Sequence, residues 1–468
     1  MVPAALCLAL IAQEPPREIS TRIVTAHDWV ARLGREMGDS IWPGFRPDTI
    51  PVLYVIPGKG SLLLGWHGEL PPGFSRVAAD PGATPRGEPV SIAAWQSSAD
   101  RGAASTGTEL AGRPTAQVVV DTQSIASLVG LTTHEAFHVF WRRFGRVENS
   151  FLVTSYPVFD PQNEAGMALE GRILAAAANA RSNAEKRAFA RQFLAVRESR
   201  QRALGADLAN FEQLAELNEG LAEYTLIRSV QLAARRPDFP DRSGAAQLQV
   251  GRLTGLHKLT EDVTLSIRLR YYATGPALGM LLDALEGPVW KMRLMNQNLT
   301  LQDALADAAG YRAPELALRR MAESTFVMSS LRRAADSGVT GLRAFRRAQV
   351  DSVLAAPGVQ LVVTIEGRSI GLCGIDPQNL LQVEPGVLLH MRWVQACAGD
   401  ALQATFNTPV VQDRTAQTLR AVVGADSTVK VSAGGQGDVL IESPLVSLRA
   451  AKADVSRDGR VLTVKIKP

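Results

Sequence analysis

The chain has 468 residues, of which 46% are hydrophobic and 21% are charged, and its formal net charge is +4. These values are typical of folded globular domains, so they exclude a chain that is disordered over most of its length. The arginines are dispersed rather than clustered, and the sequence therefore predicts no nucleic-acid partner. A chain of this length is expected to form about two to four domains.

The first segment, residues 1–12, is apolar and ends sharply at Gln13-Glu14-Pro15-Pro16. It resembles the apolar region of a secretory signal peptide, so we expect export to the periplasm or the exterior of a bacterial cell. The apolar run is too short to span a bilayer, and no later segment has a transmembrane pattern. The sequence therefore predicts no stable membrane insertion.

Residues 13–115 are expected to form a mixed α/β region. Residues 25–37 have helical character. Residues 51–56 and 61–66 are apolar runs on either side of Gly58-Lys59-Gly60, which predicts a β-hairpin. The two glycines lack the spacing of a phosphate-binding loop, so we interpret them as the turn of that hairpin.

A short apolar, β-branched run at residues 116–120 predicts another strand. Asp121, Thr122 or Ser124 can cap a helix that follows it, and Gly145 is a plausible end for that helix. The pattern therefore predicts a strand that leads directly into a largely buried helix.

That helix carries the most informative motif of the chain, His134-Glu135-Ala136-Phe137-His138. Two histidines four residues apart lie on one face of a helix, so both imidazoles can reach a single zinc ion. The adjacent Glu135 can reach a water on that ion. The alternative is an ordinary helix that carries two histidines without a metal.

A catalytic zinc usually has three protein ligands and one open position, so a third ligand is needed. Two later glutamates, each preceded by asparagine, are candidates: Glu164 and Glu219. We favour Glu219, because the small residues Gly220 and Ala222 would let its helix approach the histidine helix closely. Glu164 stays as the alternative. Glu223, one turn after Glu219, is expected to orient a ligand histidine, or else to be a solvated surface carboxylate.

The character of the sequence changes again after the helical part. Residues 116–350 are strongly helical in pattern, whereas residues 358–468 contain short alternating strands separated by turns with glycine and aspartate. This predicts a C-terminal β-sandwich-like domain. It contains Cys373 and Cys397, which either form a disulfide or are two buried thiols.

His134-Glu135-x-x-His138 followed by Leu217-Asn218-Glu219-Gly220-Leu221-Ala222-Glu223-Tyr224 resembles the gluzincin metallopeptidases. This peptidase MA-like group includes the aminopeptidase N family and thermolysin. The resemblance implies a zincin-like core and one Zn²⁺ ion held by His134, His138 and Glu219.

A third segment, Tyr272-Ala273-Thr274-Gly275, is similar to the Tyr-x-x-Gly segment of that family. There the tyrosine hydroxyl stabilises the oxyanion, so the resemblance assigns this role to Tyr272, with Tyr271 ranked second. The alternative for this tyrosine is core packing.

The resemblance covers about residues 116–300. The separation between His138 and Glu219 is longer than in the aminopeptidases, so a helical insert at about residues 164–204 must fold out or over the site. The Gly-Ala-Met-Glu-Asn segment that recognises a free substrate N-terminus is missing, and exopeptidase activity is therefore not implied.

We therefore expect a multidomain α+β protein with a mixed α/β N-terminal part, a mainly helical zincin-like catalytic core and an all-β C-terminal domain. The predicted function is zinc-dependent hydrolysis of a peptide or protein substrate, with Glu135 as general base and Tyr272 at the oxyanion. The alternatives are a zinc hydrolase that cleaves a non-peptide amide or ester, and a non-catalytic binding protein on a peptidase-like scaffold.

Overall fold

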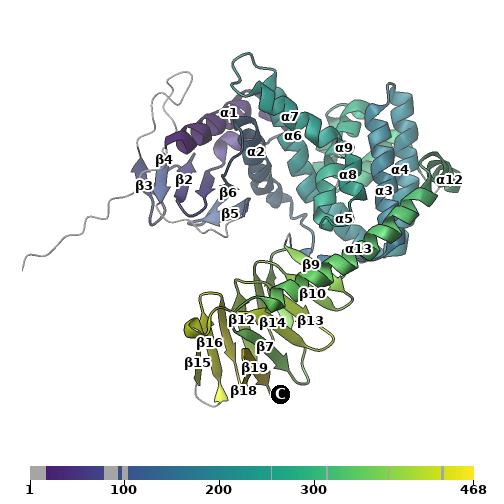
Figure 1. Ribbon diagram of the computed structural model, residues 1–468. Helices are drawn as coiled ribbons and strands as arrows, with labels where there is room; N and C mark the ends of the chain where they lie inside the picture. Colours follow the sequence, from purple (N-terminus) through teal and green to yellow (C-terminus); the bar gives the residue numbers. More distant parts are fainter. Residues whose placement is uncertain are drawn as a thin grey trace, which may run out of the picture.

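The computed structural model describes residues 17–77, 93–96, 104–254, 256–312, 315–377, 379–433 and 437–467. It combines an N-terminal sheet, a body of helices and a C-terminal β part, so the fold is of mixed α and β type (Figure 1). The predicted signal peptide, residues 1–12, lies outside the described residues.

The N-terminal part is a six-stranded sheet beside helix α1 (Arg17–Ile41). Its strand order is β3-β4-β2-β1-β6-β5, with these bounds: β1 Val52–Ile56, β2 Gly60–Leu64, β3 Ser75–Val77, β4 Ala93–Gln96, β5 Thr106–Leu110 and β6 Arg113–Val119. The predicted hairpin is confirmed, since β1 and β2 pair antiparallel with Val52 opposite Leu64. Among the described strands, β5 forms the edge of this sheet on the side of β6.

The strand-to-helix prediction is confirmed as well. Strand β6 leads into helix α2 (Ile125–Trp141), and the Ser124 side chain caps the helix by accepting a hydrogen bond from the Ser127 amide. After one 3₁₀ turn the chain reverses at Gly145, whose φ of 64° is left-handed. Aromatic side chains of α2 pack on Trp42 and Phe45, so the helix is held in the core.

Most of the remaining helices form one body. Their bounds are α3 Pro161–Asn179, α4 Asn183–Leu204, α5 Ala206–Ala215, α6 Leu221–Ala234, α7 Arg242–Thr254, α8 Leu256–Glu261, α9 Ile267–Glu286, α10 Val289–Asn296, α11 Leu301–Ala309, α12 Leu316–Thr325 and α13 Met328–Ala355. One hydrophobic cluster runs from Ile23 of α1 through the sheet to Ala335 of α13. The N-terminal sheet and the helical body therefore share a core. Among the described residues, none of the helices has the length and apolar character needed to cross a membrane.

The close helix contacts differ in one respect from the prediction. Gly220 was expected to bring its helix close to α2, but it lies against Gly275 of α9, and a Cβ atom on Gly220 would lie 2.7 Å from the Gly275 Cα. The close approach to α2 occurs instead at Gly130, where an added Cβ would lie 2.8 Å from the Leu226 Cγ. The residue before α6 therefore contacts α9, and Leu226 within α6 contacts α2.

The C-terminal part has two sheets, with strand orders β18-β19-β7-β14-β13-β10-β9 and β15-β16-β17-β12-β11-β8. The bounds are β7 Gln360–Ile365, β8 Gly371–Ile375, β9 Leu380–Glu384, β10 Val387–His390, β11 Val394–Cys397, β12 Leu402–Phe406, β13 Val410–Asp413, β14 Thr418–Val422, β15 Lys430–Ala433, β16 Val439–Ser443, β17 Val446–Ala450, β18 Ala453–Asp458 and β19 Val461–Ile466. Side chains from both sheets form one hydrophobic cluster. Cys373 and Cys397 form a disulfide between β8 and β11, so the first of the two alternatives for these cysteines is confirmed.

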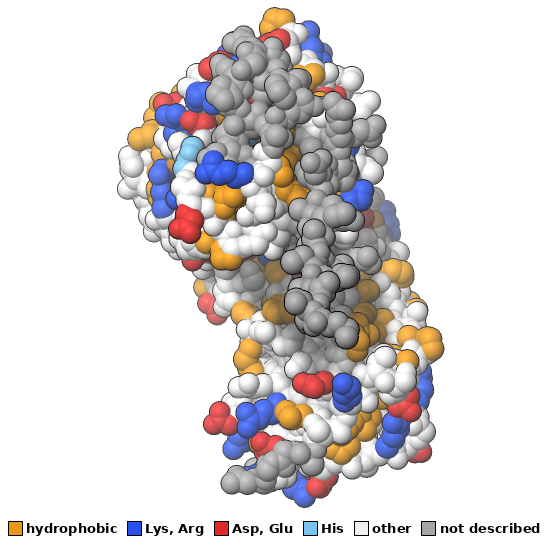
Figure 2. Space-filling model, turned by 90° about the vertical axis from the view of Figure 1, so that its left-hand side faces the viewer, with side chains coloured by type: hydrophobic (Ala, Val, Ile, Leu, Met, Phe, Trp, Pro, Cys, Tyr) orange, Lys and Arg blue, Asp and Glu red, His pale blue; other side chains and the backbone are white. Residues whose placement is uncertain are grey.

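The C-terminal sheets are fastened to the helical body. Leu380 and Leu388 join a small hydrophobic cluster with residues of the helical part, among them Phe211. The Gln382 Nε2 donates hydrogen bonds of 2.7 Å to the backbone carbonyls of Val153 and Tyr156. On the face shown in Figure 2, basic and acidic side chains are interspersed where the surface is described.

Candidate metal centre

His134, His138 and Glu219 lie together. One ligand atom from each falls within 4.8 Å of the other two. The two Nε2 atoms are 3.1 Å apart, and the Glu219 Oε2 lies 3.8 Å from His134 Nε2 and 3.5 Å from His138 Nε2. The alternative Glu164 is engaged elsewhere, because it pairs with the buried Arg270. Two imidazole nitrogens and one carboxylate are a donor set that suits a divalent metal such as zinc.

Glu219 reaches the histidines from an unusual backbone segment. Residues Glu216–Gly220 form a π-helical turn between α5 and α6, and such turns are frequent at functional sites. Glu216 at its start is held from behind by Arg197, at 2.7 and 2.9 Å, and by the Thr274 hydroxyl at 2.5 Å. These buried bonds fix the turn, and the turn directs Glu219 toward the histidine pair.

Glu223 lies behind His134, as the sequence predicted. Its Oε2 is 3.3 Å from the His134 Nδ1, and the side chain is 1% exposed, which excludes a solvated surface carboxylate. A carboxylate can only accept here, so the proton of the imidazole belongs on Nδ1. That leaves the other ring nitrogen, Nε2, directed toward Glu219 and His138, where a metal ion would take the place of a proton.

His138 is supported by residues that the sequence analysis did not name. Its Nδ1 lies 3.1 Å from the Asn218 Oδ1, and the Asn218 Nδ2 donates to the Glu148 Oε2 at 3.0 Å. The Glu148 Oε1 pairs at 3.0 Å with Arg268, which also donates to the Glu219 Oε1. The chain of contacts therefore begins at one candidate ligand, His138, and ends at another, Glu219.

Glu135 lines the same cleft beside the two histidines and is only 4% exposed. Burial raises the pKa of its carboxyl, although the charges of His134 and His138 act in the opposite direction. Its Oε2 has no hydrogen-bond partner among the described residues. A buried carboxylate with a raised pKa and an open oxygen is suited to take up a proton.

The two neighbouring tyrosines point to different places. The Tyr272 hydroxyl donates to the Glu219 Oε2 at 2.5 Å, and its ring stacks on His134 with 5.6 Å between centroids. Burial, followed by the charge of Glu219, raises the pKa of Tyr272, so the hydroxyl keeps its proton. Tyr271 is fully buried in the core beside Phe211. Of the two candidates, Tyr272 is the one that reaches the site.

The site favours positive charge. Burial by itself lowers the pKa of His134, but the bonds to Glu219 and Glu223 outweigh it and raise the pKa to about 10. Burial alone would raise the pKa of Glu219, but His138, His134 and Arg268 hold it well below its usual range. Four carboxylates are buried in this region, whereas the described lining has one buried guanidinium, that of Arg268. The carboxylates belong to Glu135, Glu148, Glu219 and Glu223. A cation at the Nε2 atoms would balance this excess of negative charge.

The residues face a cleft of about 730 Å³. One wall is formed by residues 104–107, which lead into the edge strand β5. They pass so close to α2 that a Cβ on Gly107 would lie 3.4 Å from the His138 Cβ. Another wall comes from the C-terminal part, through Ile375, Asp376, Pro377 and Arg392. The described lining includes no residue of α3 or α4, so the predicted insert packs into the helical body instead of over the cleft.

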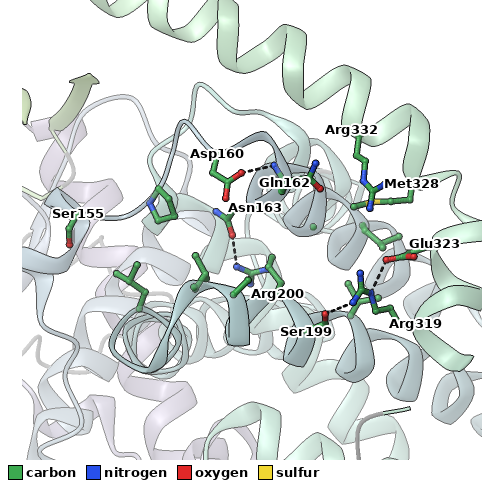
Figure 3. Close-up of a pocket in the computed structure, with 17 residues that line it drawn as sticks. Ser155, Asp160, Gln162, Asn163, Ser199, Arg200, Arg319, Glu323, Met328 and Arg332 are labelled. Atoms are coloured by element: carbon green, nitrogen blue, oxygen red, sulfur yellow. Dashed lines mark hydrogen bonds and ion pairs between the residues drawn. The ribbon is translucent and has the colours of Figure 1, made fainter. Parts of the chain in front are cut away.

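A second cavity, of about 560 Å³, lies apart from the metal centre and was not predicted (Figure 3). It is bordered by α3, α4, α5, α12 and α13. Arg319 donates to the Ser199 hydroxyl at 2.6 Å and to Glu323 at 2.8 Å, while Arg200 donates to the Asn163 Oδ1 at 3.0 Å. All five of these side chains belong to the lining of the cavity.

The candidate ligands come from α2 and from the π-helical turn, with Tyr272 on α9 completing the group. Neither a known family model, nor a curated protein, nor a solved structure matches this chain.

Proposed function

We propose that the protein is a zinc-dependent hydrolase with a zincin-like core, and that its substrates are peptides or proteins. The observation that supports this most strongly is the convergence of His134, His138 and Glu219 beside the buried carboxylate of Glu135. Zinc, when bound by these three residues, would act as a Lewis acid toward the scissile carbonyl and lower the pKa of water. The remaining chemistry belongs to side chains of the chain itself.

Glu135 acts as general base. Its carboxylate takes a proton from the attacking water and passes this proton to the leaving amine. The raised pKa that burial gives Glu135 suits both transfers, because the group must gain and lose a proton near neutral pH. The Tyr272 hydroxyl stays protonated and donates to the oxyanion that forms when the carbonyl is attacked.

The edge strand favours a peptide over a small amide or ester. Strand β5 lies at the edge of the described sheet, and residues 104–107, which lead into it, line the cleft beside His138. A sheet edge holds an extended peptide through backbone hydrogen bonds. A small ester would make no use of this edge.

A purely binding role is supported less well. Burying a carboxylate without a partner for one of its oxygens costs free energy, and Glu135 carries this cost. A binding protein would gain nothing from it, whereas a hydrolase needs a base at this position.

The test uses the full chain loaded with zinc. Metal content is measured by mass spectrometry, and hydrolysis is followed on casein, on quenched fluorescent peptides and on a panel of p-nitrophenyl esters, each with and without a chelator. We expect one zinc per chain, chelator-sensitive peptide cleavage, and a Glu135→Gln variant that keeps its zinc but loses at least about 100-fold in rate. Cleavage of the esters but not of the peptides would favour the alternative, a zinc hydrolase that acts on a non-peptide amide or ester. Equal rates for Glu135→Gln and the unmodified chain would reject the mechanism.

A further inference from the structure

The second cavity, of about 560 Å³, reaches from the surface into the helical body. It shares no residue with the described lining of the metal-centre cleft. Leu169 and Val196 in its lining are buried, whereas Asp160 and Arg332 are exposed. Its volume lies within the roughly 300–1,000 Å³ that is usual for sites of small organic ligands. The cavity is therefore open to a small molecule from solvent and large enough to hold one.

Much of the cavity wall is apolar. The apolar side chains include Leu169 of α3, Val196 and Leu204 of α4, Leu208 of α5 and Met328 of α13. A ligand with a hydrocarbon part would bury apolar surface against these side chains, and this burial favours binding. The wall therefore suits a molecule with an apolar body.

The charged groups of the cavity are unevenly placed. Figure 3 shows Arg319, Glu323 and Arg332 gathered at one end. Arg319 donates to Glu323 at 2.8 Å, whereas no hydrogen bond or ion pair joins Arg332 to another described residue. The third arginine of the lining, Arg200, is already neutralised by two buried glutamates, and Asp160 caps the start of α3. This end of the cavity therefore has two guanidinium groups, one carboxylate and an excess of one positive charge.

We propose that the cavity binds a small monoanion that has a carboxylate at the Arg319–Arg332 end and an apolar body along α4. A planar carboxylate accepts two parallel hydrogen bonds from a guanidinium, and its single charge balances the excess at this end. A phosphate carries up to about two negative charges and would be repelled by Glu323. Fatty acids of medium length and N-acylated apolar amino acids share the required chemistry.

Buried ion pairs lead from the cavity wall to the metal centre. Arg200 lines the cavity and donates to the Glu170 Oε1 at 2.6 Å, and the Glu170 Oε2 accepts from Arg197 at 2.8 Å. Arg197 in turn holds Glu216, the first residue of the π-helical turn that carries Glu219. A ligand that packs on α4 restrains both arginines of this network. The cavity is therefore an effector site, at which carboxylate binding and zinc binding strengthen each other.

The first measurement identifies the ligand chemistry. Octanoate and N-acetyl-leucine are titrated calorimetrically into the full chain, and the tighter of the two indicates which source the ligand has. Acetate lacks the apolar body, octylamine has the opposite charge, and inorganic phosphate has a higher charge. We expect the better carboxylate to bind at least about tenfold more tightly than any of these three compounds. Equal or tighter binding of octylamine or phosphate, or no binding of either carboxylate, would overturn the proposal.

Two substitutions place the ligand in the cavity. Arg332→Gln removes a guanidinium that has no described partner, so the fold should persist while the affinity for the better carboxylate falls at least about tenfold. Ala203→Phe puts a ring into the apolar part and should lower the affinity similarly. Thermal melts check that both variants are folded.

The matched controls are Arg333→Gln and Ala334→Phe, because both residues are exposed on α13 and neither lines the cavity. They should bind the carboxylate as the unmodified chain does. Unchanged affinity in both Arg332→Gln and Ala203→Phe would place the ligand elsewhere and overturn the assignment.

The second measurement tests the link to the metal centre. Competition with a fluorescent chelator gives the zinc affinity with and without the better carboxylate, and acetate at the same concentration controls for direct binding of zinc. We expect zinc affinity to rise about fivefold, and carboxylate affinity to rise by the same factor when zinc is bound. Arg332→Gln should remove both effects, and Arg333→Gln should keep them. Carboxylate binding without any change in zinc affinity would keep the site but overturn its role as an effector site. Neither measurement requires turnover, so failure of the proposed hydrolysis would leave both results standing.

Discussion

The Asn218 side chain donates from its Nδ2 to the Glu148 Oε2 at 3.0 Å, and this bond determines how His138 is presented. A carboxylate cannot donate, so the Asn218 amide must turn its Nδ2 toward Glu148 and its Oδ1 toward His138. The Oδ1, 3.1 Å from the His138 Nδ1, then accepts that ring proton. The Nε2 of His138 is thus the nitrogen that faces a metal, just as Glu223, by holding the Nδ1 of His134, turns the Nε2 of that ring toward the site.

Glu148→Gln tests this relationship. Because a glutamine side chain can donate as well as accept, it no longer forces the orientation of the Asn218 amide. It also removes the charge that pairs with Arg268. Zinc affinity should therefore fall by about 10- to 100-fold. Competition with a fluorescent chelator measures the affinity without reference to turnover. Glu261→Gln, which removes a partly exposed pair with Arg172, is the control and should not change it. Unchanged affinity in Glu148→Gln would mean that the orientation of His138 is set in another way.

The choice of third ligand is tested by two variants of the same kind. Glu219→Gln should lose stoichiometric zinc, because one of the three candidate ligands is weakened. Glu164→Gln should keep its zinc but lower the free energy of unfolding by about 3–5 kcal/mol, since it leaves Arg270 buried without its partner. Metal analysis and denaturant titration distinguish the two results, and the reverse pattern would make Glu164 the ligand.

The neighbouring tyrosines offer a matched pair of substitutions. Tyr272→Phe should lower kcat by about 100- to 1,000-fold with little change in KM, because it removes a donor to the oxyanion. Tyr271→Phe changes a core residue that does not line the cleft, so its activity should stay within about twofold. Similar losses in both variants would indicate a structural effect instead of a catalytic one.

Acid should weaken the fold through two histidines that are buried in neutral form. Burial lowers the pKa of His27 and of His390 to about 4. In the unfolded chain each titrates near 6.5, so the unfolded state binds more protons below that pH and stability falls as pH drops from 6.5 toward 4. Each histidine should contribute a slope of up to about 1.4 kcal/mol per pH unit. Urea titrations across this range should show a smaller slope for His390→Asn, and an identical slope would contradict the assignment.

The disulfide between Cys373 and Cys397 should stabilise the C-terminal sheets. It closes a loop with a sequence separation of 24 residues, and replacing both cysteines by serine should cost about 3 kcal/mol. Calorimetry of the double variant, and of the unmodified chain under reducing conditions, measures this cost. Zinc content should be the same in all samples, since the disulfide is not part of the metal centre.

The sequence indicated the parts of the site that depend on local spacing. One helical turn brings His134 and His138 together, and this follows from their spacing. The residues around Glu219 and Tyr272 were found through a family resemblance. The structure places all four side chains around one cleft. Glu148 was not predicted, because its role depends on a contact with Asn218 across 70 positions of the chain. A contact of this kind leaves no periodic pattern in one sequence.

The helix that each glycine contacts could not be predicted from the sequence either. Small residues beside Glu219 did indicate a close helix contact, but not which helix would make it. The partner of Gly220 is Gly275 on α9, whereas the approach to α2 depends on Gly130. The π-helical turn Glu216–Gly220 was equally unpredictable, since buried bonds from distant Arg197 and Thr274 hold it.

The C-terminal sheets supply Asp376 and Arg392 to the cleft, although the candidate ligands, Glu135 and Tyr272 come from α2, the π-helical turn and α9. Loops between β-strands tolerate replacement and insertion better than a packed helix does. If the proposed function holds, selectivity on this wall can change over evolutionary time, or be redesigned, while the residues of the candidate metal centre stay as they are. An engineer who wished to retarget the protein would begin with these loops.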